Sequence, residues 1–143
     1  MKKLMLSAVA IVAMCTVSLA QEHGEKKEKA VNVPTAVTAA FAKQFGPTDA
    51  DWEKEGANYE AEFERNKKET SAVFSADGKL LETEVEIPVA ELPAAAMEYI
   101  KKNHAGATVK EAAKITDAAG VVSYEAEIKG KDLIFDAKGN FVK

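Results

Sequence analysis

Few residues in this chain are of the types that perform chemistry in proteins. The 143 residues include one cysteine, two histidines, one tryptophan and a single arginine, Arg65. Because the one cysteine, Cys15, lies in an apolar N-terminal stretch, the rest of the chain can hold neither a disulfide nor a cysteine-ligated metal. Acidic residues outnumber basic ones by 23 to 19, which argues against nucleic-acid binding, since phosphate contacts need clustered Lys and Arg.

The first 20 residues have the pattern of a secretory signal peptide. A basic start at Lys2 and Lys3 precedes an almost wholly apolar run over residues 4–17, and the small residues Ser18 and Ala20 mark a cleavage site. A retained membrane anchor is disfavoured, because the apolar stretch is short for a membrane span and no basic stop-transfer cluster follows it. The pattern therefore predicts cleavage near Ala20, a periplasmic or secreted location, and no membrane attachment afterwards.

Residues 21–32 are predicted to form a charged linker. The segment from Gln21 to Ala30 is polar, mixes both signs of charge and shows no apolar period. Loss of residues 1–20, which contain two lysines and no acidic residue, would change the net charge from −4 to −6.

From Val33 onward the chain consists of two related halves, residues 33–87 and 92–143, which we expect to form a single domain. Each half opens with an apolar residue and a proline, Val33-Pro34 and Leu92-Pro93, and proline suits the first turn of a helix. Apolar residues then recur at helical spacing, which predicts helices over residues 34–44 and 93–103.

Behind each predicted helix the pattern changes to an alternation of period two, which is typical of strands. Residues 59–63, YEAEF, and residues 124–128, YEAEI, are near copies, and residues 73–80 match residues 134–141 as a strand, a turn and the next strand. Each half is therefore predicted to contain one helix and about four short antiparallel strands, with the helices on one face of the sheet. Because a unit of about 55 residues is only marginally stable alone, the two halves of this α+β fold are expected to share one core.

These motifs together resemble a known family. They are VPTAVTAAFAKQF at 33–45, YEAEF at 59–63, FSADGKLLETEVEIP at 74–88, ELPAAAMEYI at 91–100 and LIFDAKGNFVK at 133–143. The set is similar to the PepSY-like, β-lactamase-inhibitor-like proteins exported by Bacteroidetes-type bacteria. The resemblance implies a tandem helix-plus-four-strand fold with one broad sheet face and, by analogy with PepSY domains, inhibition or escort of a secreted hydrolase. His104 departs from the family pattern, which has an aromatic residue at that position.

No grouping of residues predicts catalysis or a metal site. The three serines beyond the leader lie on predicted strands or their edges, and His104 is the only histidine within the predicted fold. His104 is expected to be a partly buried replacement for an aromatic side chain. The turns near Asp77 and Asp136 are expected to be hairpins, because they lack the alternating oxygen ligands and the distal glutamate of a calcium loop. The sequence thus predicts a protein that is not an enzyme and that has no cofactor.

Glutamates alternate with apolar residues along the predicted strands and would point away from the helices. The row is either an ordinary solvated surface, neutralised by nearby lysines, or an electrostatic docking surface for a basic partner. A pair of glycosidase carboxylates is disfavoured, because carboxylates in a flat row would stay ionised. Trp52 is expected to be half-buried, but it would be a binding hot spot if it were exposed on the sheet. The candidate partner-binding face consists of Glu60, Glu62, Glu64, Glu82, Glu84, Glu86, Glu125, Glu127 and Trp52.

The sequence favours an exported, non-enzymatic protein that binds a protein or peptide through its sheet face. The alternative is an acidic envelope protein that binds cations weakly through the same carboxylates. A small hydrolase would need a cleft that brings His104 together with carboxylates. The identity of the partner and the oligomeric state are left open.

Overall fold

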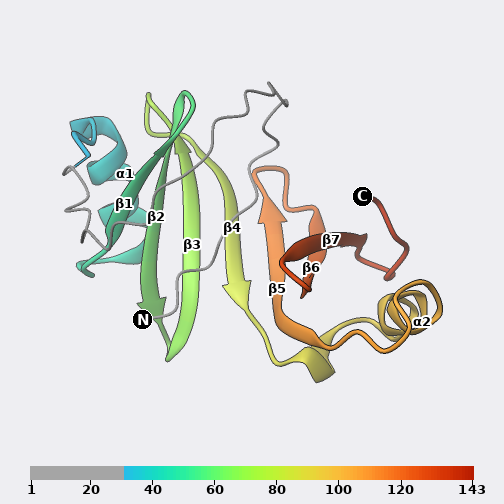
Figure 1. The fold of residues 1–143 in the computed structure, drawn as a ribbon. Helices are drawn as coiled ribbons and strands as arrows, with labels where there is room; N and C mark the ends of the chain where they lie inside the picture. The colour runs from blue at the N-terminus through green and yellow to red at the C-terminus, as the bar shows by residue number, and fades with distance from the viewer. Residues whose placement is uncertain (1–30) are drawn as a thin grey trace, which may run out of the picture. The chain divides into compact units, whose positions relative to one another are not determined.

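A computed structural model describes residues 31–143, which form two α-helices, a short 3-10 helix and one sheet of seven antiparallel strands (Figure 1). The predicted signal peptide, residues 1–20, and nearly all of the predicted linker, residues 21–32, lie outside the described residues. At the start of the described chain, Val31 and Val33 pack against the first hydrophobic core. Within residues 31–143, no helix is long and apolar enough to cross a membrane.

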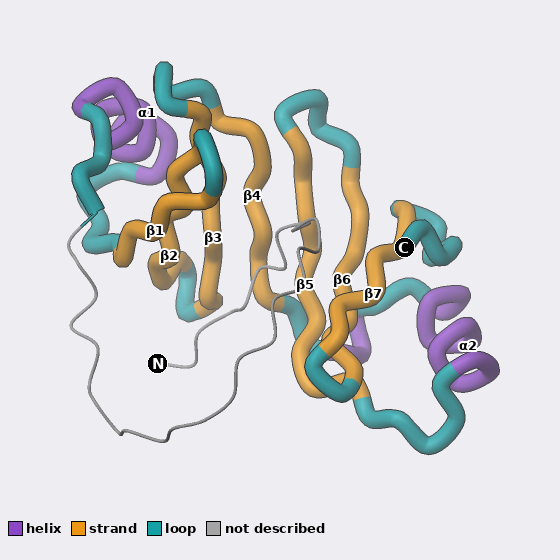
Figure 2. Tube along the Cα trace, turned by 45° about the horizontal axis from the view of Figure 1, so that its top comes forward, coloured by secondary structure: helices purple, strands orange, loops and turns teal. Residues whose placement is uncertain are grey.

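The strands follow one another across the sheet in sequence order, so that each pairs with the next along the chain (Figure 2). The first half contributes β1 (Asp51–Glu55), β2 (Asn58–Arg65), β3 (Lys68–Ser75) and β4 (Leu80–Glu86). The second half contributes β5 (Val109–Asp117), β6 (Val122–Ile128) and β7 (Lys131–Asp136). The second half thus has three strands, because the chain after β7 returns only as an isolated bridge between Phe135 and Phe141. The pairing of β4 with β5 makes the sheet continuous through both halves.

Each half begins with a helix, as predicted, but each proline precedes its helix. Helix α1 spans Thr35–Phe45 and helix α2 spans Ala94–Asn103, and the 3-10 helix η1, Val89–Glu91, lies in the joint before α2. Pro34 and Pro93 have non-helical ψ angles of 144° and 139°. Their carbonyl groups accept the first hydrogen bonds of the two helices at 3.0 and 3.2 Å in both cases. Each proline therefore occupies the N-cap position of its helix.

Each helix covers a hydrophobic core of its own. The core under α1 consists of Val37, Phe41, Tyr59, Ala61, Phe63, Ala72 and Phe74. The core under α2 consists of Ile87, Leu92, Ala96, Ile100, Ala112, Ala126, Ile128, Leu133 and Phe135. The prediction of one shared core is therefore wrong. On the helix-covered face, the junction of β4 and β5 pairs Thr83 with Thr116 and Val85 with the exposed Lys114, and these polar groups separate the two clusters.

The hairpin glycine of each half packs against the start of that half's helix. A Cβ atom on Gly78 would lie 2.5 Å from the backbone oxygen of Ala36 in α1, and one on Gly139 would lie 2.8 Å from the backbone nitrogen of Ala96 in α2. Both glycines have positive φ, 85° and 86°. Only glycine fits this close approach without strain, so the turns hold the helices against the sheet in the same way in both halves.

Candidate functional site

The sheet has one face covered by helices and one face that carries carboxylates. On β2 the odd-numbered residues 59, 61 and 63 belong to the first core, so the intervening glutamates point to the opposite face. Strand pairing extends that face across the sheet through Glu60↔Val73↔Glu82, Glu62↔Ser71↔Glu84, Glu86↔Ala113↔Glu125 and Glu111↔Glu127. The eight predicted glutamates therefore share one face, here called the acidic face: Glu60, Glu62, Glu64, Glu82, Glu84, Glu86, Glu125 and Glu127.

The eight glutamates of the acidic face stand on every second strand. They lie on β2, β4 and β6, which places the three rows roughly 10 Å apart at the usual spacing between strands. The strands between them carry small or apolar residues in the middle of the face, Ser71 and Val73 on β3 and Ala113 and Ile115 on β5, and these four side chains are buried. The face therefore consists of shallow apolar strips bordered by carboxylates.

Glu84 stands at the centre of the acidic face and is almost completely buried. Its side chain is 1% exposed, and neither Oε1 nor Oε2 has a hydrogen-bond partner within residues 31–143. The pKa of Glu84 is raised to about 9, first by burial and then by the negative charges of Glu125 and Glu60. Glu84 therefore carries its proton at neutral pH.

Two further glutamates have pKa values close to neutrality. Burial is the main cause of the raised pKa of Glu60, about 7, and the Ser71 hydroxyl partly offsets it. The pKa of Glu125 is also raised to about 7, first by burial and then by the nearby charge of Asp132. The pKa of Glu82 is raised by burial as well, although Lys143 opposes the shift. A charge at any one of these groups thus makes ionisation of the next less favourable.

These findings correct the prediction that a flat row of glutamates would stay ionised. The ends of the rows fit that description, since Glu64 is exposed and Glu127 forms an ion pair with Lys110 at 3.7 Å. The centre does not, because the register places buried Val73 beside Glu60, and buried Ser71 and Ile115 on the two sides of Glu84. The role of the eight glutamates in partner binding stays a prediction.

Trp52 lies on the opposite, helix-covered face. It pairs with Ala61 across β1 and β2, and its ring centroid lies 5.3 Å from that of Phe41 and 6.3 Å from that of Phe74. This agrees with the half-buried core role that the sequence favoured, and it separates Trp52 from the glutamates with which the candidate face grouped it. The side chain packs against the first core and is not part of the acidic face.

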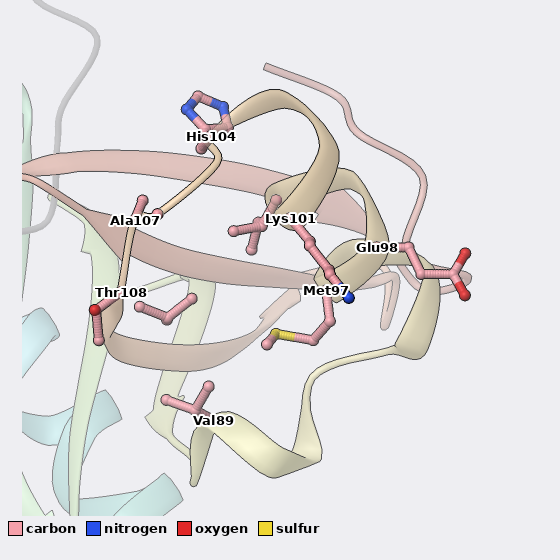
Figure 3. A pocket seen from close by; sticks show the side chains of 10 residues that line it. Val89, Met97, Glu98, Lys101, His104, Ala107 and Thr108 are labelled. Atoms are coloured by element: carbon pink, nitrogen blue, oxygen red, sulfur yellow. The ribbon is translucent and has the colours of Figure 1, made fainter.

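His104 is half-buried at the end of α2, with its ring centroid 6.2 Å from that of Tyr99. It borders a cavity with Glu98, but the Glu98 carboxylate points away from that cavity (Figure 3). The hydrolase hypothesis required a cleft that gathers His104 with carboxylates, and this arrangement does not supply it. The sequence identified His104 as a departure from the family pattern, but not as a residue that borders a cavity.

The carboxylates of residues 31–143 form no group of three or more acidic or histidine side chains arranged to hold a metal ion. In the hairpin turn after β7, the aspartate stabilises the turn itself. Asp136 Oδ1 accepts hydrogen bonds from the backbone N–H groups of Lys138 and Asn140 at 2.8 and 2.9 Å. This turn is the hairpin that the sequence predicted.

Two related helix-plus-strand halves that share one sheet define the class of fold, and comparison with known sequences identifies the family. The family described as "putative beta-lactamase-inhibitor-like, PepSY-like" matches residues 23–82 and again residues 57–143. The chain therefore belongs to this family, as its motifs indicated. A search among curated proteins finds no match.

Solved structures from Bacteroides species have the same fold. A protein described as a "putative periplasmic protein" from Bacteroides eggerthii DSM 20697 is 19% identical, with a TM-score of 0.69 over 78% of this chain and 86% of that one. A BLIP-like protein from Bacteroides fragilis NCTC 9343 is 20% identical, with a TM-score of 0.60 over 77% of this chain and 84% of that one. Neither is described as an enzyme.

Proposed function

We propose that this protein is an exported, non-enzymatic binding module whose acidic face docks a basic region of a protein or peptide partner. The observation that carries the proposal is Glu84, a carboxyl group buried at the centre of the face without a hydrogen-bond partner in the described chain. A buried polar group without a partner is unfavourable, and a cationic side chain would supply both donors and opposite charge.

The shape of the acidic face suits lysine or arginine side chains. The apolar stem of such a side chain would lie over Val73 or Ile115, and its charged head would reach the carboxylates on the neighbouring strands. An incoming positive charge would lower the pKa values of Glu60, Glu84 and Glu125, so that binding would release protons and strengthen as the pH rises.

A periplasmic location is part of the proposal. It is supported by the N-terminal pattern over residues 1–20 and by the description of the Bacteroides eggerthii relative as periplasmic. The BLIP-like relative adds support for protein binding. Inhibition or escort of a secreted hydrolase is the finer form of the proposal, and it rests on the family analogy.

Affinity capture from periplasmic extract tests the proposal. The face variant carries Glu82→Gln, Glu84→Gln and Glu86→Gln. The control variant carries Asp49→Asn, Glu91→Gln and Glu98→Gln, which replace the same number of carboxyl groups at exposed positions away from the acidic face. We expect the wild-type protein and the control variant to retain a partner at low salt, and the face variant to lose it. Capture should also weaken at high salt, where exposed charges are screened.

Equal capture by the face variant and the wild-type protein would refute the proposal.

Calorimetric titration with calcium, zinc and copper distinguishes protein or peptide binding from weak cation binding. Saturable heat from a metal would favour the cation-binding alternative, and flat titrations would remove it.

A further inference from the structure

The last turns of α2 border a cavity of about 520 Å³, together with η1 and the segment that leads into β5 (Figure 3). Its walls are largely apolar and come from Val89, Met97, Ile100, Ala107 and Val109. A volume of this size lies within the range of small-molecule pockets, which are mostly apolar with a few polar groups at defined positions.

The corresponding part of the first half is filled by aromatic rings. In the repeat, Phe45 corresponds to His104, Phe41 to Ile100 and Phe63 to Ile128. The ring centroid of Phe45 lies 5.3 Å from that of Phe41 and 4.8 Å from that of Phe63. The second half therefore has an imidazole and two aliphatic side chains where the first has three packed rings. Ile100 and His104, at two of these three positions, border the cavity.

One lysine, Lys101, borders the mouth of the cavity. The Lys101 side chain extends alongside Met97, whereas the Glu98 carboxylate points away into solvent (Figure 3). Met97 is 37% exposed, and its flexible thioether adapts to ligands of varied shape. An apolar cavity with an ammonium group at its mouth is complementary to a molecule with an apolar chain and an anionic end.

We propose that this cavity binds a medium-chain fatty acid, with its hydrocarbon chain against Met97, Ile100 and Val109 and its carboxylate beside Lys101. The cavity is on the helix-covered side of the second half, whereas the acidic face is on the other side of the sheet. The proposal therefore does not rest on the proposed function, and either can fail without the other.

Methionine-methyl NMR tests the proposal directly, because Met97 is the only methionine within residues 21–143. The exported chain is labelled with [methyl-13C]methionine, the Met97 signal is assigned with Met97→Leu, and sodium decanoate is titrated. We expect a saturable shift of the Met97 signal with decanoate, and weaker binding of decyltrimethylammonium, which has the same chain and the opposite charge.

Three variants sharpen the result. Lys101→Gln should weaken decanoate binding about two- to fivefold, the effect of one exposed ion pair, whereas Lys102→Gln, the adjacent exposed lysine that does not border the cavity, should leave it unchanged. His104→Phe, which imitates Phe45, should fill the cavity and weaken binding by about tenfold.

The proposal is overturned if decanoate produces no saturable shift at Met97. It is equally overturned if Lys102→Gln weakens binding as much as Lys101→Gln, or if decyltrimethylammonium binds as tightly as decanoate. Sedimentation of the chain with phosphatidylglycerol vesicles, without a decanoate-induced shift, would assign the cavity to a membrane surface and would also overturn it.

Discussion

Ser71 on β3 lies directly opposite Glu84 on β4, and on its other side it faces Glu62 on β2. Ser71 is 2% exposed and Glu84 is 1% exposed, although neither α1 nor α2 packs on this face of the sheet. Within residues 31–143 neither the Ser71 hydroxyl nor the Glu84 carboxyl group has a hydrogen-bond partner, and the neighbour of Glu84 on β5 is the apolar Ile115. Glu84 is therefore an acid kept in its neutral form at the centre of an acidic surface, and the first prediction follows from that state.

The free energy of unfolding should fall as the pH rises from about 4.5. Glu60, Glu84 and Glu125 have folded-state pKa values raised from 4.5 to about 7, 9 and 7, so the folded chain holds protons that the unfolded chain has released. The stability that these groups contribute is complete below pH 4.5 and is lost as the pH rises through the folded-state values. Urea unfolding between pH 5 and about 9 measures the slope.

Glu84→Gln should flatten that pH dependence and stabilise the protein by roughly 1–3 kcal/mol at pH 9, because glutamine has no charge to bury. Glu64→Gln is the matched control, since Glu64 belongs to the same face but is exposed. If both variants unfold with the same pH profile as the wild-type protein, the account of Glu84 is wrong.

Gly78→Ala should destabilise the protein more than Gly120→Ala. Both positions have positive φ, 85° and 81°, so both substitutions carry about 1 kcal/mol of backbone strain. Only the Cβ atom at position 78 would meet the backbone of Ala36, and this overlap should add roughly 1–3 kcal/mol. Chemical unfolding of the two variants gives the difference, and equal losses would show that the turn does not support α1.

Phe41→Ala and Ile100→Ala should loosen different halves of the sheet. These residues occupy equivalent positions in the two repeats, but Phe41 belongs to the core under α1 and Ile100 to the core under α2. Each substitution should destabilise its own core by about 2–5 kcal/mol. Native-state hydrogen exchange should quicken mainly in β2 and β3 for Phe41→Ala, and mainly in β6 and β7 for Ile100→Ala. Identical exchange patterns would mean that the two cores open as one unit.

Phe45→His should destabilise the protein by about 1–3 kcal/mol, because it removes ring contacts with Phe41 and Phe63 and leaves a cavity beneath α1. The reverse change, His104→Phe, should be neutral or stabilising by up to about 1 kcal/mol, since the space for the ring exists. Thermal unfolding compares the pair. A loss of stability in His104→Phe equal to that in Phe45→His would show that the repeat correspondence does not describe the packing.

Local pattern was sufficient to predict the two helices and the orientation of the glutamates, but not η1 or the presence of only three strands in the second half. The helices follow from apolar residues at helical spacing, and the common face of Glu60, Glu82 and Glu125 follows from strict alternation along each strand. The two separate cores could not be predicted, because Lys114 and Val85 become neighbours only through pairing across the joint.

The protonation state of Glu84 could not be predicted from the sequence either. Its pKa depends on burial and on carboxylates from β2 and β6, which are distant in the chain. The cavity beside α2 depends on volumes contributed by η1, α2 and β5 together, so His104 could be identified as a departure from the repeat but not as the border of a pocket.

Calorimetric titration of the exported chain with an acetylated and amidated hexalysine peptide tests the central claim most directly. Measured at pH 7 in two buffers of different ionisation enthalpy, binding should release protons, because a cationic partner favours ionised Glu60, Glu84 and Glu125. Glu84→Gln should reduce both the affinity and the number of protons released, and Glu64→Gln should leave the proton release unchanged. Binding without proton release, or an equal release in Glu84→Gln, would contradict the role assigned to the acidic face.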